Sequence, residues 1–410
     1  MVLNRTERQQ LGVRKWQAAG CRATLQWSTG VGKTRAALMA IKGFLSTNTN
    51  KNIVVVVPTE YLKIQWIQEL SQYFLLSYVK VEIINSAIKS DEKIDFLILD
   101  ECHRIPSDTF YEVFNKRNPE SVLGLSATFN RLDGRHKLLD EFCPVCDVIT
   151  VQEAIKNKWL SPYKEYKVLI EPDDIDIYRE ANREFIDAFS VFNFDFQLAM
   201  NCMTNIVQRR IYGKKLGMSV SDMDAVTFTW GRALRVRKDY VMNHPKKIEL
   251  ARKIIEARPF NKIITFSSTI KQAEKIGYGY VVHSGKTKKK NRMTMEEFSL
   301  LPIGVINTAK SLDEGADIKG LNTAIILSNT SSATQKTQRI GRIIRYEEGK
   351  EAEIFTLVIK GTNEEGWYTT STAGKNYIEI TEEELDDILL GKESENIEQE
   401  GKEVGQMFRF

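Results

Sequence analysis

The chain has 410 residues, 42% of them hydrophobic and 27% charged, which predicts roughly two to three domains with sizeable cores and excludes wholesale disorder. Its formal charge of +4 is uneven, because residues 361–410 hold 4 Lys/Arg against 13 Asp/Glu while residues 1–360 hold 54 against 41. A basic body suggests a polyanionic partner, and the acidic tail is a candidate site for a protein partner. The longest purely apolar run, residues 53–57, is far shorter than a membrane span, so we expect a cytoplasmic protein that does not enter a membrane.

Residues 1–155 alternate β-rich runs with amphipathic helical patterns. Helices are predicted over residues 34–45 and 62–74, and strands over residues 23–27, 53–57, 80–84, 96–99 and 122–125. Fully apolar strands separated by helices are typical of a parallel sheet that is covered on both faces.

Near the end of this region Cys143 and Cys146 have the spacing of metal ligands, but no second cysteine pair completes a tetrahedral zinc site, so we expect no metal there.

Residues 156–258 are predicted to form a connector and a basic helical segment. From Asn205 to Lys247 the chain holds ten Lys/Arg against three acidic residues, and Phe228 and Trp230 lie among them. Two interpretations remain open for this segment. It is either a solvated helical linker or a surface that follows the backbone of a nucleic acid.

The α/β pattern returns in residues 259–375, which predicts a second domain of the same class. Helices are predicted over residues 270–276 and 334–345, and strands over residues 262–266, 280–283, 304–307, 323–327 and 352–358. In residues 376–410, Thr381 followed by three glutamates predicts the start of an acidic helix, and the charged remainder is predicted to be a disordered tail. The predicted fold class is therefore α/β, with two tandem domains, a helical segment between them and an acidic tail.

The segment STGVGKT, residues 28–34, lies between the first predicted strand and the first predicted helix. Gly30 and Gly32 allow the backbone to curl so that its N–H groups face an anion at the helix N-terminus. Lys33 supplies positive charge for the β- and γ-phosphates, and Thr34 supplies a hydroxyl for Mg²⁺. The strict phosphate-loop pattern begins with another glycine, whereas this chain has Trp27 at that position.

Two carboxylates, Asp100 and Glu101, directly follow the apolar strand predicted over residues 96–99. In a parallel sheet the end of this strand faces the same crevice as the phosphate loop. Asp100 is then placed to hold Mg²⁺, and Glu101 to take a proton from an attacking water.

The segment QRIGRIIR, residues 338–345, lies on the last predicted helix of the second domain. Arg342 and Arg345 are three residues apart, so on a helix they share a face and can reach one phosphate. Guanidinium groups at such a position stabilise charge on a transferring phosphoryl group, and Gln338 would lie close to that group and its water.

In chain order, GKT at 32–34, PT at 58–59, DECH at 100–103, SAT at 126–128 and QRIGRIIR at 338–345 resemble the motifs of superfamily 2 helicases of the DExH type. The resemblance covers roughly residues 10–360. Residues 125–134, LSATFNRLDG, are similar to a run in XPB-type and phage UvsW-type DNA helicases and in restriction-enzyme translocase motors, which often have proline where Phe129 stands. The resemblance implies two RecA-like domains with ATP and Mg²⁺ bound in the cleft between them.

The resemblance also implies roles for individual residues. Residues 13–17 are similar to the family's adenine-side element, which implies that Gln17 contacts the base. Further ATP contacts are implied for Thr29 and, in the fifth motif, for Gly315 and Asp317, while Mg²⁺ is implied at Thr34 and Asp100. Coupling between ATP and nucleic acid is implied for His103, Ser126 and Thr128. Contacts with nucleic acid are implied for Pro58, Thr59, Arg131, Ser267 and Thr308.

Three functions remain open at this point. The favoured one is a monomeric DNA helicase or translocase, with the 3′→5′ direction of the family, acting on single-stranded, duplex or branched DNA. The second is an RNA helicase of the same architecture. The third is a nucleotide-gated clamp or loader that grips nucleic acid without separating its strands.

Overall fold

The computed structural model describes residues 3–47, 51–104, 107–127, 137–309, 318–329, 333–372, 375–392 and 399–400. The chain forms two compact units, and each is described by itself. The first unit comprises Met1–Tyr163, Leu312–Asn322 and Thr334–Ala352, and the second comprises Lys164–Ser311, Thr323–Ala333 and Glu353–Phe410. No helix within the described ranges is long and apolar enough to span a membrane.

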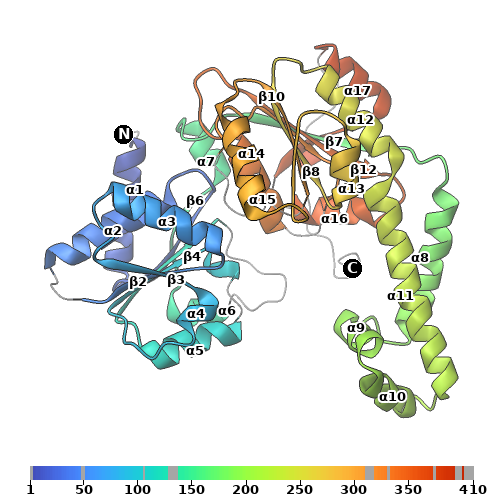
Figure 1. The fold of residues 1–410 in the computed structure, drawn as a ribbon, viewed down its shortest axis with the longest axis horizontal. Coiled ribbons are helices and arrows are strands. Elements are labelled where there is room, and N and C mark those ends of the chain that lie inside the picture. The colour runs from blue at the N-terminus through green and yellow to red at the C-terminus, as the bar shows by residue number, and fades with distance from the viewer. Residues whose placement is uncertain are drawn as a thin grey trace. The chain divides into compact units, whose positions relative to one another are not determined.

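The first unit contains a six-stranded sheet in which every neighbouring pair of strands is parallel (Figure 1). The strand order is β3-β2-β4-β5-β1-β6. Its strands are β1 (Arg22–Trp27), β2 (Ile53–Val57), β3 (Val79–Ile83), β4 (Phe96–Asp100), β5 (Ser121–Ser126) and β6 (Val145–Ile149). The first five match the predicted strands, whereas β6 was not predicted, because Asp147 interrupts its apolar pattern.

Helices cover this sheet, with α1 against β1, β6 and α2, and α3 against β2 and β3. Their ends carry side-chain caps: Asn4 forms a capping box with Glu7 at the start of α1, and Thr59 accepts a hydrogen bond from the backbone of Leu62 at the start of α3. The helices of this unit are α1 (Arg5–Ala18), α2 (Lys33–Thr47), α3 (Glu60–Gln72), α4 (Ile84–Ala87), the 3₁₀ turn η1 (Cys102–Arg104), α5 (Ser107–Arg117), α6 (Lys137–Phe142), α7 (Val151–Lys156) and α15 (Ala333–Ile343), whose first residue belongs to the second unit.

The sheet of the second unit has the order β14-β13-β7-β12-β11-β8-β10-β9. Its strands are β7 (Tyr163–Ile170), β8 (Lys262–Ser267), β9 (Tyr280–His283), β10 (Gly304–Ala309), β11 (Thr323–Ile326), β12 (Ala352–Ile359), β13 (Asn376–Thr381) and β14 (Gln399–Glu400). The predicted limits of this domain, 259 and 375, therefore lie inside the observed sheet, since β7 comes from the predicted connector and β13 from the predicted tail. Both strands contain charged residues: within β7, Glu165 and Lys167 are buried, and Lys167 forms an ion pair with Glu379 of β13 at 2.6 Å.

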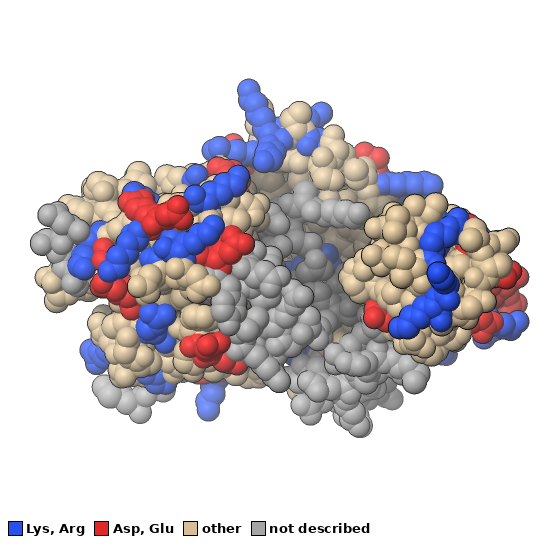
Figure 2. Space-filling model, turned by 90° about the horizontal axis from the view of Figure 1, so that it is seen from below, with Lys and Arg blue, Asp and Glu red and all other residues tan. Residues whose placement is uncertain are grey.

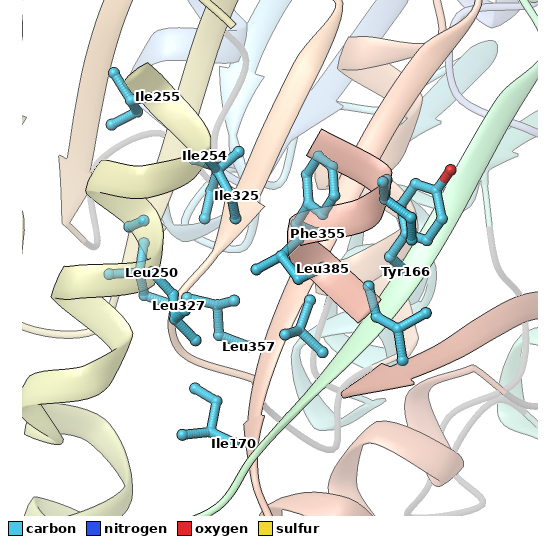
Figure 3. Packing of buried hydrophobic residues seen from close by; sticks show 14 of the residues in the cluster. Tyr166, Ile170, Leu250, Ile254, Ile255, Ile325, Leu327, Phe355, Leu357 and Leu385 are labelled. Carbon is cyan, nitrogen blue, oxygen red and sulfur yellow. The ribbon is translucent and has the colours of Figure 1, made fainter. Parts of the chain in front are cut away.

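One face of this sheet forms a large apolar core under α12 and α17 (Figure 3). Alternate residues of β12 (Phe355, Leu357 and Ile359) point to that face, as the two-residue period of a strand requires. The helices of this unit are α8 (Ile175–Ser190), α9 (Phe196–Thr204), α10 (Ile206–Lys215), α11 (Val220–Asn243), α12 (Pro245–Glu256), α13 (Ile270–Lys275), α14 (Lys288–Leu300), α16 (Asn363–Ser371) and α17 (Glu382–Leu389). All ten predicted strands and the four predicted α/β helices are confirmed, with ends shifted by at most two residues, and Thr381 is the N-cap of α17, as predicted.

Helices α8 to α11 form a helical arm, residues 175–243, that extends away from the sheet of the second unit (Figure 1). The arm has its own apolar core around Trp230, which is fully buried against Phe185, Phe189 and Phe192. At the base of the arm, Lys247 in α12 forms a buried ion pair with Glu364 in α16, with Nζ–O distances of 2.7 and 2.8 Å. Both side chains are fully shielded from solvent.

Most of the basic residues counted between Asn205 and Lys247 have partners within the unit. Arg237 is buried with its guanidinium 4.0 Å from the ring centre of Phe185, and five others form ion pairs: Arg209 and Arg210 with Asp224, Arg232 with Glu184, Lys246 with Asp173, and Lys247 with Glu364. The other four are exposed: Lys214, Lys215, Arg235 and Lys238. Figure 2 shows Lys and Arg side chains on the outer end of the arm. The positive charge that the arm offers to a partner is therefore smaller than its composition suggests.

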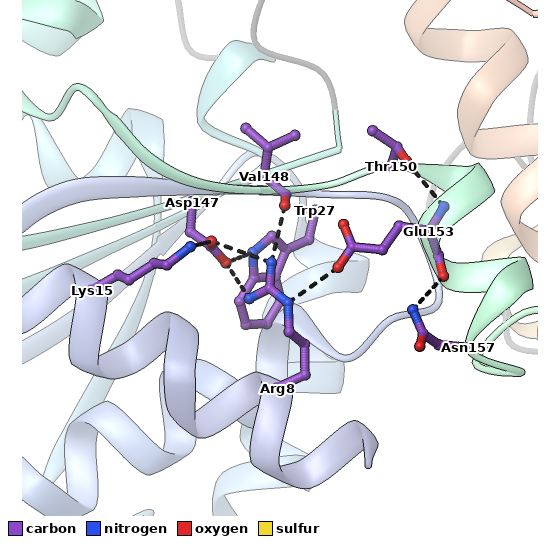
Figure 4. A network of polar contacts seen from close by, with 8 residues as sticks. All are labelled: Arg8, Lys15, Trp27, Asp147, Val148, Thr150, Glu153 and Asn157. Carbon is purple, nitrogen blue, oxygen red and sulfur yellow. Dashed lines mark hydrogen bonds and ion pairs between the residues drawn. The ribbon is translucent and has the colours of Figure 1, made fainter. Parts of the chain in front are cut away.

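A buried polar network fastens α1 to the sheet of the first unit (Figure 4). The Asp147 side chain on β6 is only 1% exposed, and its carboxylate accepts hydrogen bonds from Arg8 (2.6 Å) and Lys15 (2.6 Å) on α1 and from the Trp27 indole (2.8 Å) at the end of β1. Arg8 also donates to the backbone oxygen of Val148 and to Glu153. Burial alone would raise the pKa of Asp147, but the hydrogen bonds from Arg8 and Lys15 outweigh burial and hold that pKa below its ordinary value.

Replacing Asp147 by asparagine should destabilise the first unit, because Arg8 and Lys15 would lose their buried counter-charge. We expect a loss of about 3 kcal/mol at pH 7 in urea unfolding followed by tryptophan fluorescence. Since the native pKa of Asp147 is depressed, the advantage of the wild type should be complete above about pH 4 and disappear as the pH falls below that value. Glu153→Gln is the matched control, because that side chain is 37% exposed, and it should cost less than about 1 kcal/mol. Equal losses in the two variants would contradict the role given to Asp147.

Candidate active site

A tight loop between β1 and α2 carries the predicted phosphate-binding residues. Gly30 and Gly32 have φ values of 89° and 99°, which only glycine adopts readily. The loop leads into the N-terminus of α2, whose first turn contains no acidic residue, so the helix dipole there favours an anion. Lys33 donates to the backbone oxygen of Trp27 at 3.0 Å, and Thr29 Oγ1 is buried with no hydrogen-bond partner among the described residues. A loop with these features suits a phosphate group.

Trp27, which replaces the first glycine of the usual loop pattern, is a docking surface for α1. Its side chain is fully buried, and a Cβ atom added to Gly12 of α1 would lie 2.1 Å from the indole ring. The helix can therefore approach the loop this closely only because residue 12 has no side chain. The tryptophan thus packs against α1, while Gly30 and Gly32 are retained in the loop.

Helix α1 brings Gln9 and Arg5, rather than the predicted Gln17, to the loop. The Gln9 amide donates to the Val31 backbone oxygen at 2.9 Å, and Arg5 donates to the same oxygen at 3.1 Å and to the backbone oxygen of Gly30. Gln17 is exposed and lies eight residues further along α1, about 12 Å away along the helix axis. Gln9 therefore replaces Gln17 as the candidate for a contact with the base. Its Oε1 is buried with no hydrogen-bond partner among the described residues. The four-residue spacing of Arg5 and Gln9, just after the cap at Asn4, was the signal that sequence reasoning missed.

The two predicted carboxylates lie at the carboxyl end of β4. Asp100 is buried; its Oδ2 accepts from the Trp66 indole of α3 at 2.8 Å, and its Oδ1 accepts from the Glu101 backbone at 3.0 Å. Burial, followed by the negative charge of Glu101, raises the pKa of Asp100 to about 6. Glu101 has a φ of 47°, a strained value for a residue with a side chain. Strained backbone of this kind is concentrated at sites where a side chain must point in a set direction.

His103 links the end of β4 to the end of β5. Its Nδ1 lies 2.8 Å from Ser126 Oγ and 3.5 Å from Glu101 Oε2, and both His103 and Ser126 are buried. The structure therefore brings together two of the three residues predicted to couple ATP to nucleic acid. The third, Thr128, lies outside the described residues.

Within the first unit, α15 lies against the phosphate loop. A Cβ atom added to Gly341 would lie 2.4 Å from Cβ of Thr29, so only glycine allows this approach. The approach brings Gln338, Arg342 and Arg345 to a cavity of about 920 Å³. The other predicted site residues that line this cavity are Thr29, Gly30, Gly32, Lys33, Thr34, Asp100 and Glu101.

The described residues that were predicted to contact nucleic acid are divided between the two units. Pro58 and Thr59 follow the carboxyl end of β2, where Thr59 caps α3. In the second unit, Ser267 and Thr308 lie on the neighbouring strands β8 and β10; both are buried, and the Thr308 hydroxyl donates to the Thr265 backbone oxygen at 2.8 Å. Three further predicted site residues lie outside the described residues: Arg131, Gly315 and Asp317.

Two protein-family models match the chain. The model described as "Type III restriction enzyme, res subunit" matches residues 4–92 and 75–131, and the model described as "Helicase conserved C-terminal domain" matches residues 246–347. A DNA 3′-5′ translocase, XPB2, of Sulfurisphaera tokodaii is 26% identical over 82% of this chain and 77% of its own length. A putative ATP-dependent RNA helicase of African swine fever virus is 32% identical, but over only 28% of this chain and 26% of its own length.

Solved helicase structures share the fold. The RNA-bound Dbp5 of S. cerevisiae aligns with a TM-score of 0.58 and 12% identity, covering 93% of this chain and 91% of the other. The Hef helicase domain of Pyrococcus furiosus aligns with a TM-score of 0.50 and 17% identity, covering 90% of this chain and 99% of the other. The two sheets, parallel except for the β13–β14 pair, are thus tandem RecA-like domains, as predicted. With the res-subunit model and the helicase C-terminal model matching in chain order and a translocase relative aligned over 82% of the chain, this chain is an ATP-hydrolysing helicase of superfamily 2.

Proposed function

We propose that this helicase is a DNA motor that uses ATP hydrolysis to move 3′→5′ along DNA and to remodel duplex or branched DNA. The observation that carries the proposal is the match to the Sulfurisphaera tokodaii DNA 3′-5′ translocase over 82% of the chain. The cavity of the first unit supports the ATP hydrolysis in this proposal, because the phosphate loop, the two carboxylates and the two arginines line the same space.

The cavity fits ATP with Mg²⁺. The positive-φ glycines suit phosphate oxygens, as does the Thr29 hydroxyl, which has no hydrogen-bond partner in the part of the chain that the structure describes. A carboxylate beside a hydroxyl is the hard oxygen donor set that Mg²⁺ prefers. Asp100 and Thr34 would hold the ion, which would neutralise charge on the β- and γ-phosphates.

Each side chain around the cavity then has a separate task. Lys33 binds the β- and γ-phosphates, and Gln9 contacts the base. Glu101 accepts a proton from the attacking water, which is why the direction of its side chain matters. Arg342 and Arg345 stabilise charge on the γ-phosphoryl group, and Gln338 lies close to the water.

Nucleic acid is proposed to contact Pro58, Thr59, Arg131, Ser267 and Thr308. Such contacts go mainly to phosphates and sugars and therefore carry little sequence preference. The exposed lysines and arginines of the helical arm are candidates for further phosphate contacts. A role for RNA as the substrate is the second candidate, favoured by the 32% identity to the viral RNA helicase, although that match spans only 28% of the chain.

Steady-state ATP hydrolysis should be strongly stimulated by DNA. The measurement compares no nucleic acid, single-stranded DNA, forked DNA and RNA, with Lys33→Ala as the inactive control. Because Lys33 lies against the transferred phosphates, its loss should lower the rate at least about 100-fold on every substrate. Stronger stimulation by RNA would replace the DNA motor with an RNA helicase, and stimulation without strand separation on forked DNA would favour a translocase or clamp.

Arg342→Ala should lower kcat by about 100-fold or more and change the ATP KM far less, because the guanidinium acts on charge that develops in the transition state. Arg339→Ala is the matched control, since Arg339 lies on the same helix but does not line the cavity. The two variants are compared by steady-state kinetics with saturating DNA. A rise in the ATP KM of Arg342→Ala without a fall in kcat would instead assign Arg342 to binding of ATP in the ground state.

DNA binding should weaken steeply with salt, because Lys and Arg side chains that contact phosphates release counterions. Between 50 and 200 mM KCl we expect the Kd for single-stranded DNA, measured by fluorescence anisotropy, to rise by about 10-fold or more. Oligonucleotides of unrelated sequence should show the same dependence of Kd on the KCl concentration. An affinity independent of salt would rule out backbone tracking.

A further inference from the structure

Trp66 is a side chain of α3 that forms a direct hydrogen bond with Asp100. It is 2% exposed, lines the cavity of the first unit, and donates its indole N–H to Asp100 Oδ2 at 2.8 Å in a buried hydrogen bond. An indole N–H is a donor only, so this contact favours a carboxylate acceptor in one fixed orientation.

The second oxygen of Asp100 is also held. Oδ1 accepts from the Glu101 backbone N–H at 3.0 Å, so two donors on opposite sides determine the rotation of the carboxylate. One of these donors is local to the chain around Asp100. The other, Trp66, comes from a helix 34 residues earlier in the sequence. Of these two donors, only Trp66 makes the orientation of the Asp100 carboxylate depend on the position of another helix.

Helix α3 begins at the predicted contact with nucleic acid. Its N-cap is Thr59, and Trp66 follows two helical turns later, about 10 Å along the axis. The strands on which the two sites sit are neighbours, since β2 pairs with β4 in parallel register. A rigid helix of this length carries any displacement at Thr59 directly to Trp66.

We propose that Trp66 is a positioning residue that orients Asp100 for Mg²⁺ and connects that carboxylate to the nucleic-acid contact at the start of α3. The inference rests on the proposed function, because it takes Asp100 as the magnesium-binding carboxylate and Thr59 as a nucleic-acid contact. Trp66 does not touch the reacting atoms. Its effect passes through the orientation of Asp100.

Trp66→Phe tests the proposal, because it removes the N–H and keeps most of the ring. The first measurement is equilibrium binding of a fluorescent ADP analogue in Mg²⁺ and in EDTA. In the wild type Mg²⁺ should tighten binding, and in Trp66→Phe this gain should be about 10-fold smaller while affinity in EDTA is unchanged. The second measurement is the ratio of ATPase rates with and without single-stranded DNA, which should also fall.

Trp16→Phe is the matched control. Trp16 is another buried tryptophan of the first unit, also 2% exposed, but its indole donates to the Val122 backbone oxygen at 2.7 Å and it does not line the cavity. Its loss should lower stability without changing the response to Mg²⁺ or DNA. Trp66→Tyr, which also lacks the indole N–H, is measured in parallel and serves alone if the Phe variant does not fold.

The outcomes separate the inference from the proposed function. If Mg²⁺ and DNA have no effect on the wild type, both the motor and the role of Trp66 are overturned. If the wild type responds and Trp66→Phe responds equally, or if Trp16→Phe loses the response to the same extent, only the role of Trp66 is overturned. Selective loss in the Trp66 variants supports it.

Discussion

The parallel order of three neighbouring strands, β4, β5 and β1, is the constraint on which the active site depends. Parallel strands place the segments that follow them at one edge of the sheet. Gln26 of β1 is therefore level with Ser126 of β5, and Leu125 is level with Asp100 of β4. Residues far apart in the sequence meet at that edge without any long loop to hold them.

A second constraint is the buried charge of Asp147 at the edge of the same sheet. It attracts two cations of α1 and one indole of β1, so the helix lies close to the phosphate loop and Gln9 and Arg5 reach the loop's carbonyl oxygens. A buried carboxylate is costly by itself, and here its partners neutralise it. The substitution of tryptophan for the first loop glycine belongs to the same arrangement, since Trp27 supplies both a hydrogen bond and the surface against which Gly12 packs.

Apolar strands and the motifs at their ends could be predicted from the sequence, because full burial leaves a continuous hydrophobic run and the loop chemistry is tied to a few residue types. Strands β6, β7 and β13 could not, because their charged residues, such as Asp147 and Lys167, have partners that only the fold brings together. For the same reason the sequence left open whether the segment with Trp230 and Arg237 is a solvated linker or a nucleic-acid surface, whereas both side chains are buried inside the arm. The sequence pointed to Gln17 and not to Gln9, because local similarity does not reveal which end of a helix meets the loop.

The buried Lys247–Glu364 pair also determines the point about which the helical arm can tilt. Only His244 separates α11 from α12, and Lys247 lies in the first turn after that junction. Glu364 also accepts backbone hydrogen bonds from Ile359, the last residue of β12, and from Asn329, which follows β11 in the chain. The junction between α11 and α12 is therefore fixed to the sheet of the second unit, and it is the point about which α11 would tilt. With α11 about 36 Å long, a tilt of about 10° there would carry the tip of the arm about 6 Å.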